Sequence, residues 1–264
     1  MKRTLLHIVC LLQYESNRPK SYGLFHLICL FTCLLAAWIL ISRDETDHEK
    51  SLKKILSFYG WIALILELMK QVVWSYDGQK WSYQWYAAPF QLCTTPIYAC
   101  LLASCFPKCR IRDGLLSYVA YVTMLGSLAT AAYPESCFVK TVLVNIHTMF
   151  LHMGSLSVSV YLIFKEISPV RRSWISGYKT FLLFVSIAEV LNVTVYHSGI
   201  LNGQTFNMFY ISPYFISALP VFSAIQQHVT FLLFLLIYLT AIFVGSGCIY
   251  LLSSTFNKFI RIAG

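Results

Sequence analysis

The amino-acid sequence predicts an all-α protein of the polytopic membrane class, folded as a bundle of about seven transmembrane helices. Of the 264 residues, 58% are hydrophobic and only 12% are charged. The mean hydropathy is +0.65, well above the range of a soluble domain. The apolar runs are long enough to cross a hydrocarbon core about 30 Å thick as helices. The alternating ten-residue segments of an outer-membrane barrel are absent from the sequence.

Residues 1–20 are expected to form an interfacial N-terminal segment. The opening MKRTLLHIVCLLQ has the basic start of a signal peptide, but its apolar part is short and no small-residue cleavage site precedes the charged ESNRPK. After this segment, the apolar runs predict seven spans within a single integral membrane domain that covers residues 1–264. In chain order, the expected spans are residues 24–42, 55–76, 85–106, 115–132, 138–165, 174–199 and 221–252.

The distribution of charge predicts the topology. The net charge is +9, but Lys and Arg lie at the ends of spans rather than in a soluble basic domain, so a nucleic-acid partner is not expected. With seven spans, six basic residues fall on the N-terminal side of the membrane and thirteen fall on the other side. The positive-inside rule then predicts that the N-terminus is outside and the C-terminus is cytoplasmic.

Polar residues inside the spans gather toward the predicted outer half of the bilayer. The clearest are Glu67 and Lys70 in the second span and Glu189 and Asn192 in the sixth. A charged group that faces lipid costs several kcal/mol, so these side chains are expected to line a hydrated pocket that marks a functional site. A structural ion pair between Glu67 and Lys70 is the alternative.

The stretch WYAAPFQLCTTPIYAC, residues 85–100, is the most unusual of the apolar runs. Pro89 and Pro96 each remove a backbone donor and are expected to bend a helix around Cys93. A thiol at such a bend can reach a wet cavity, where donors such as Gln91 stabilise a thiolate. The alternative is a cysteine that only fills space in the core.

A nucleophilic thiol needs a base, and the fifth span offers His147 and His152. On a regular α-helix the two rings point about 140° apart, so only one of them is expected to meet Cys93. A two-histidine metal site prefers a spacing of four residues rather than five, and the nine cysteines form no C-x-x-C pair. No metal, other cofactor or disulfide framework is therefore expected.

Five short motifs carry a family resemblance. In chain order they are YGLFHLICL, ELMK, APFQLCTTPIYA, FLHMGSLSVSVYLIF and NGQTFNMFYISP. The set resembles the YwaF-like bacterial integral membrane proteins, and the same pattern is similar to the animal transmembrane protein 164 family. Members of the animal family are regarded as acyltransferases that remodel phospholipids. The resemblance implies a protein of the bacterial cell membrane with phospholipids and lysophospholipids as partners.

The resemblance also implies roles for individual residues. It places a catalytic-type cysteine at Cys93 and the matching histidine at His152. It aligns the acidic and basic pair of the second span with Glu67 and Lys70, the first-span histidine with His26, and a polar element before the last span with Asn207 and Tyr210. Two positions depart from the family pattern: Gln91 replaces a histidine, and Leu151 replaces a serine.

The leading hypothesis is a membrane-embedded lipid acyltransferase in which His152 activates Cys93 to form an acyl-thioester. Lys70 is expected to hold a lipid phosphate, and Gln91 or Asn192 to donate to the oxyanion. A lipid-ester hydrolase with the same Cys/His pair and a non-enzymatic seven-helix transporter or binding protein remain alternatives. The residues expected to bind substrate are Glu67, Lys70, Gln91, Glu189, Asn192, Asn207 and Tyr210.

Overall fold

The structure of the protein is a computed structural model that describes residues 2–43 and 47–263. It confirms the all-α prediction. Within the described residues, six helices are long and apolar enough to cross a membrane, and a shorter apolar helix lies among them. The main elements are α1 (Lys2–Leu12), α2 (Leu24–Ser42), α3 (His48–Ser75), α4 (Thr95–Cys105), α5 (Arg110–Ser117), α6 (Met124–Ala132), α7 (Val142–Met149), α8 (Ser155–Tyr161), α9 (Arg171–His197), α10 (Pro220–Gln226) and α11 (Phe231–Ala263).

Two of the long helices contain wider, π-helical turns. The π-turn η2 (Tyr118–Thr123) joins α5 to α6, so that Arg110–Ala132 forms one continuous helix that is long and apolar enough to cross a membrane. In the same way η4 (Phe150–Gly154) joins α7 to α8, and η5 (Leu162–Glu166) follows α8. A π-turn shifts the helical phase and is frequent at functional sites.

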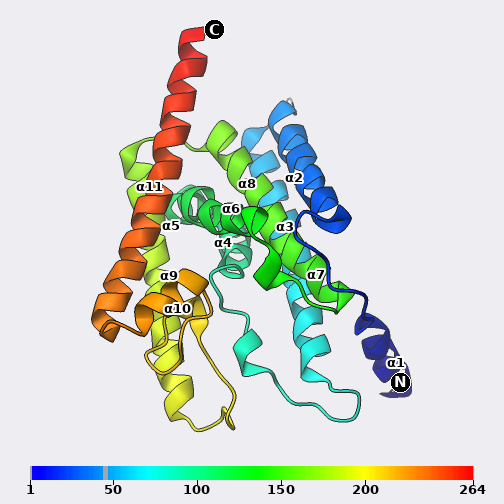
Figure 1. Cartoon of the computed structure of the whole chain (residues 1–264). Helices are drawn as coiled ribbons and strands as arrows, with labels where there is room; N and C mark the ends of the chain where they lie inside the picture. Colours follow the sequence, from blue (N-terminus) through cyan, green and yellow to red (C-terminus); the bar gives the residue numbers. More distant parts are fainter. Residues whose placement is uncertain (1, 44–46, 264) are drawn as a thin grey trace.

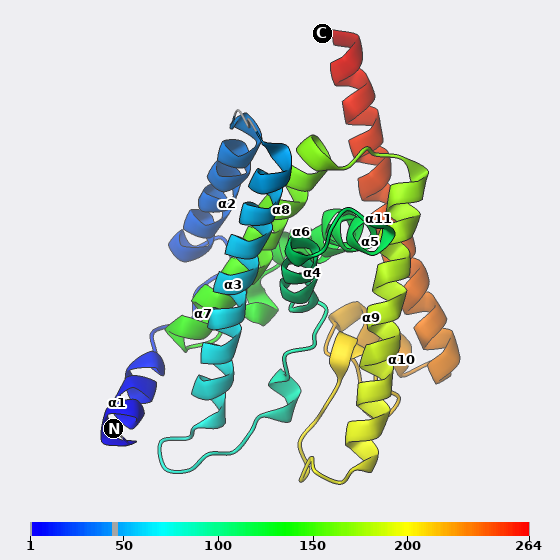
Figure 2. The same cartoon turned by 180° about the vertical axis from the view of Figure 1, so that it is seen from behind.

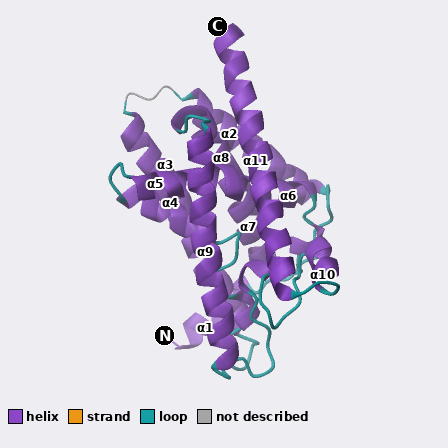
Figure 3. Ribbon diagram, turned by 90° about the vertical axis from the view of Figure 1, so that its left-hand side faces the viewer, coloured by secondary structure: helices purple, strands orange, loops and turns teal. Residues whose placement is uncertain are grey.

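The helix formed by α5, η2 and α6 is the centre of the bundle. The helices α3, α7 with α8, α9 and α11 run roughly along one direction (Figures 1 and 2), whereas the central helix crosses them (Figure 3). Its η2 turn contacts α4, α8, α9 and α11. Tyr118, Ala120 and Tyr121 of this turn are fully buried, so the apolar core of the protein lies around η2.

The predicted span at residues 85–106 is wrong in its first half. Only Thr95–Cys105 is α-helical, and the preceding residues form a short 3-10 turn, η1 (Trp85–Ala87), followed by irregular backbone. Pro96 stands in the first turn of α4, where the missing backbone donor costs nothing. Pro96 therefore starts the helix instead of bending it, and Cys93 lies in the irregular segment before it.

The predicted seventh span, residues 221–252, is divided in two. Helix α10 ends at Gln226 and α11 begins at Phe231. The Gln226 side chain accepts a hydrogen bond from Ser217 N at 2.7 Å and donates to Ser212 O at 3.3 Å. These contacts fold α10 back on the preceding loop. Part of that loop, the 3-10 turn η6 (Met208–Tyr210), packs against α9.

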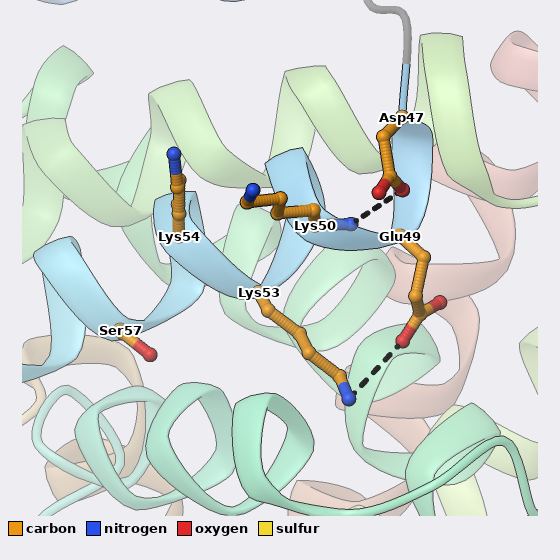
Figure 4. Close-up of a pocket in the computed structure, with 6 residues that line it drawn as sticks. All are labelled: Asp47, Glu49, Lys50, Lys53, Lys54 and Ser57. Atoms are coloured by element: carbon orange, nitrogen blue, oxygen red, sulfur yellow. Dashed lines mark hydrogen bonds and ion pairs between the residues drawn. The ribbon is translucent and has the colours of Figure 1, made fainter.

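A polar hollow lies at one end of the bundle. The described N-terminal helix lies at one end, and α11 finishes at the other (Figure 1). A hollow of about 410 Å³ lies along the first turns of α3, at the end where α11 finishes (Figure 4). Arg112 is bound there to Glu49 by two hydrogen bonds of 2.7 and 3.1 Å. The side chains that line the hollow are Asp47, Glu49, Lys50, Lys53, Lys54 and Ser57.

Candidate functional site

A buried polar cluster lies on α3, at the end opposite this hollow. Glu67 is about 27 Å further along the helix than Glu49, at a rise of about 1.5 Å per residue. The Glu67 Oε1 atom forms an ion pair with Lys70 Nζ and accepts a hydrogen bond from Gln71 Nε2, each at 2.7 Å. Its Oε2 atom lies 2.7 Å from His147 Nε2 on α7. Both carboxylate oxygens therefore have partners, as a buried charge requires.

The cluster also holds the irregular segment before α4. Lys70 Nζ donates to the Ala87 carbonyl oxygen at 3.2 Å, and Gln71 Nε2 donates to the same oxygen at 2.5 Å. The Lys70 ammonium lies 5.6 Å from the centroid of the Trp74 ring. Lys70, which we expected to hold a lipid phosphate, is thus buried and engaged with protein groups. Its substrate-binding role stays a prediction.

His147 was not among the site residues predicted from the sequence. Its Nε2 atom faces Glu67, while its Nδ1 atom is buried without a hydrogen-bond partner among the described residues. A carboxylate bound to one ring nitrogen fixes the imidazole and leaves the other nitrogen as the available acceptor. The signal that the sequence offered was a histidine inside a membrane span. That this histidine faces the buried Glu67 carboxylate is shown only by the fold.

Cys93 lies in the irregular segment that Lys70 and Gln71 bind at the Ala87 carbonyl oxygen. The residue is half-buried and its thiol is free, and the charges of Lys70 and Glu67 act on it. Gln91, two residues before Cys93, accepts a hydrogen bond through its backbone carbonyl oxygen from Thr94 Oγ1 at 3.0 Å. The Gln91 backbone N–H donates back to Thr94 Oγ1 at 2.9 Å. This local turn fixes the backbone on both sides of the thiol.

His152 lies in the π-turn η4 and is half-buried. A π-turn has more residues per turn than an α-helix, so it shifts the helical phase between His147 and His152 away from the 140° expected for a regular α-helix. The backbone of the turn is fixed from outside, because Tyr59 on α3 donates to Leu151 O at 3.1 Å. No hydrogen bond joins His152 to Cys93 in the described part of the chain, and their catalytic pairing stays a prediction.

Gln91 and Asn192 both bind the backbone of η6 and its flanks. Gln91 Nε2 donates to Asn207 O at 3.1 Å, and Gln91 Oε1 accepts from Phe209 N at 3.1 Å. Asn192 Oδ1 accepts from Met208 N at 2.7 Å, and its Nδ2 donates to Met208 O at 3.1 Å. These amides, which we expected to donate to an oxyanion, instead connect the Cys93 segment and α9 to one turn of the loop.

The remaining predicted residues divide between this turn and its surroundings. Asn207 Oδ1 accepts from Ser212 N at 2.8 Å, which closes the turn, and Tyr210 ends it. Glu189 is half-buried on α9 and accepts from Asn192 Nδ2 at 3.4 Å. His26 is fully buried on α2 and packs edge-on against Phe138.

An apolar groove of about 310 Å³ lies beside the turn that carries His152. One wall is α2, with Phe25, Cys29 and Cys33, and the other is the helix that contains η4, with Phe150 and Met153. Most of its surface is hydrocarbon. A groove of this composition between membrane-spanning helices suits a lipid chain.

These observations define a polytopic helical membrane protein in which a cluster of a buried carboxylate, ammonium and imidazole binds the irregular segment that carries a half-buried cysteine. The chain belongs to the TMEM164 family, whose sequence model matches residues 19–244. No curated protein and no solved structure matches the chain.

Proposed function

We propose that this protein is a lipid acyltransferase with Cys93 as the nucleophile. The observation that carries the proposal is the position of Cys93, a half-buried residue on the irregular segment that Lys70 and Gln71 of the Glu67 cluster bind at the Ala87 carbonyl oxygen. Irregular backbone at membrane depth is tolerated where it lines a cavity or is buried in protein. The activity implied by the resemblance to the animal family supports the same conclusion.

The reaction has two balanced steps. His152 takes the thiol proton, the Cys93 sulfur attacks the carbonyl carbon of a phospholipid ester, and the ester C–O bond breaks. The departing lysophospholipid oxygen takes the proton from the imidazolium, and the acyl group stays on sulfur as a thioester. An acceptor lysophospholipid hydroxyl then gives its proton to the imidazole and attacks the thioester. The C–S bond breaks, and the protonated imidazole returns its proton to the sulfur.

The apolar groove between α2 and η4 supports a lipid substrate. Its wall includes Gly154, where an added Cβ atom would lie 3.0 Å from the Tyr59 ring. The glycine therefore lets Tyr59 of α3 approach η4 closely. An acyl chain in this groove would lie along the turn that carries His152.

The test uses the purified protein in lipid nanodiscs with a phospholipid labelled in its acyl chain and an unlabelled lysophospholipid. Cys93→Ala should abolish both label transfer and the covalent acyl-protein adduct. Cys105→Ala is the matched control, since Cys105 is an exposed cysteine at the end of α4. Unchanged transfer by the Cys93 variant would rule out the mechanism. Release of labelled free fatty acid instead of transfer would identify the hydrolase.

A transporter or binding protein is the second candidate. It is favoured by the broken segment before α4 and by the buried Glu67 next to it, because transporters bind solutes at discontinuous helices near the membrane centre. In that case Cys93→Ser should leave solute binding nearly unchanged, whereas Glu67→Gln or Glu189→Gln should impair it. The acyltransferase requires the Cys93 thiol and the transporter does not, so the Cys93 variants separate the two candidates.

A further inference from the structure

Three tyrosines lie within electrostatic range of the Cys93 thiol: Tyr59, Tyr118 and Tyr210. The Tyr59 hydroxyl donates to Leu151 O at 3.1 Å. The Tyr118 hydroxyl shares a hydrogen bond of 2.6 Å with Thr95 Oγ1. The Tyr210 hydroxyl has no partner among the described residues. Of the three phenols, Tyr210 alone keeps its donor available for another molecule.

The backbone that carries Tyr210 is held in an unusual conformation. Phe209 and Tyr210 have φ angles of 58° and 60°, in the left-handed region that residues other than glycine rarely adopt. Consecutive residues in this region persist only where the surroundings fix them, and such positions gather at functional sites. Gln91 and Asn192 provide that restraint, since each amide donates one hydrogen bond to the backbone of the turn and its flank and accepts one from it.

The Gln91 hydrogen bonds also join this turn to the nucleophile. Gln91 is two residues from Cys93, so the side chain that holds Phe209 belongs to the same short segment as the thiol. The position of Tyr210 relative to Cys93 is thus fixed through only a few residues, from Cys93 to Gln91 and from the Gln91 side chain to Phe209. Asn192 fixes the opposite side of the turn to α9.

The protonation state of Tyr210 suits a donor. Burial raises the pKa of its hydroxyl, and the nearby Cys93 thiol raises it further. The phenol therefore keeps its proton at neutral pH. A neutral phenol in a buried site can donate a hydrogen bond to a developing negative charge.

We propose that the Tyr210 hydroxyl donates a hydrogen bond to the carbonyl oxygen of the acyl group that reacts at Cys93. The inference rests on the proposed acyl transfer and names the group that stabilises its oxyanion. When the Cys93 sulfur attacks, the carbonyl π electrons move onto oxygen, and Tyr210 stabilises that charge without giving up its proton. The carbonyl re-forms when the ester C–O bond breaks. Gln91 and Asn192 are then positioning residues that act through the turn.

The first test compares Tyr210→Phe with Tyr214→Phe in the nanodisc assay. Tyr214 lies in the same loop, and its hydroxyl contacts His197 at 2.8 Å. Loss of one oxyanion donor lowers kcat by about 100-fold or more. We expect this fall for Tyr210→Phe at an unchanged KM, and a nearly normal kcat for Tyr214→Phe. Equal rates for the wild type and Tyr210→Phe would overturn the inference, as would equal losses in the two variants.

The second test detects the hydrogen bond between the Tyr210 hydroxyl and the acyl carbonyl oxygen directly. A thioester formed with a carbonyl-labelled acyl group has an infrared C=O band that shifts to lower frequency when the oxygen accepts a hydrogen bond. Tyr210→Phe should move this band to higher frequency, and an unmoved band would contradict the inference. A ring-fluorinated tyrosine at position 210 keeps the donor and should retain activity, which separates loss of the hydroxyl from loss of the fold.

The outcome also separates this inference from the proposed function. If Cys93→Ala still transfers acyl groups, the proposed function fails. If Cys93→Ala is inactive and the wild type forms a thioester while Tyr210→Phe behaves as the wild type, only the role of Tyr210 is refuted.

Discussion

Glu67 and His147 meet where α3 packs against α7, with 2.7 Å between the carboxylate Oε2 and the imidazole Nε2. They come from α3 and α7 and are both buried. The carboxylate also binds Lys70 and Gln71, and through them it is connected to the Ala87 carbonyl. One carboxylate thus joins two long helices to the segment that leads to Cys93.

Glu67→Gln should destabilise the protein strongly. The variant leaves the buried Lys70 ammonium without its ionic partner, and breaking a buried pair in this way costs about 3–5 kcal/mol. Denaturant unfolding in detergent measures the loss. The control is the double variant Glu67→Gln with Lys70→Met, which removes both charges and should recover part of the stability. A single variant as stable as the wild type would show that the pair contributes nothing.

Gln91→Leu should loosen the turn that carries Tyr210. The variant leaves the Phe209 N–H without its acceptor, and an unpaired buried donor costs about 1–3 kcal/mol. Hydrogen exchange followed by mass spectrometry should show faster exchange in the peptide that contains Phe209. Gln84→Leu is the control, because the Gln84 amide only donates to the nearby Ser82 O at 3.1 Å. Equal exchange in both variants would contradict the restraint.

Gly177→Ala should separate α9 from the central helix. A Cβ atom at Gly177 would lie 2.6 Å from the Ser117 carbonyl carbon and oxygen, which are backbone atoms that cannot rotate away. We expect a loss of about 1–3 kcal/mol in unfolding free energy. Gly126→Ala in α6 is the matched control, with nothing within 4 Å of the added atom, and it should stabilise its helix by up to about 1 kcal/mol. The reverse order of stability would show that the helices do not approach here.

The contact of Arg18 and Ser21 with η3 (Glu135–Cys137) should depend on pH. The Ser21 hydroxyl donates to Glu135 at 2.6 Å, and this bond, with Arg18 nearby, holds the pKa of Glu135 below its ordinary value of 4.5. Because the pKa of Glu135 is lower in the folded state, the contact stabilises the protein above pH 4.5. This stabilisation is lost as the pH falls through the lowered folded-state pKa.

Limited proteolysis of residues 14–22 at a series of pH values, with an acid-stable protease, tests this dependence. Cleavage in the wild type should increase as the pH falls below 4.5. Glu135→Gln should already be cleaved faster at neutral pH and should show a smaller change on acidification. A wild type and variant with identical pH profiles would disprove the role of the carboxylate.

The hydropathy pattern predicted the membrane class and located most helices. The first span, residues 24–42, coincides with α2, because a lipid-facing helix must be apolar over its whole length. The pattern was wrong at residues 85–94, where apolar side chains occur on irregular backbone. Hydropathy measures transfer to lipid, and it does not distinguish a helix from a loop that is buried in protein.

The candidate site was predictable in part. The cost of an intramembrane charge singled out Glu67 and Lys70 in the sequence. The structure joins them in an ion pair of 2.7 Å, which was the alternative interpretation, and their binding of substrate stays a prediction. His147 was missed because its partner is on another helix and the π-turn after it changes the helical phase. The amides Gln91 and Asn192 were expected to face substrate. Their actual partners are backbone atoms of a loop more than a hundred residues from Gln91, and only tertiary structure brings that loop to them.

The central crossing helix has a consequence for biosynthesis. Its η2 turn is enclosed by α8, α9 and α11, all of which follow it in the chain. When Arg110–Ala132 leaves the ribosome, most of the surface that will cover it has not been translated. The helix must therefore wait in the bilayer or in the insertion machinery with Tyr118 and Tyr121 uncovered. The bundle can close around it only after α11 has been synthesised.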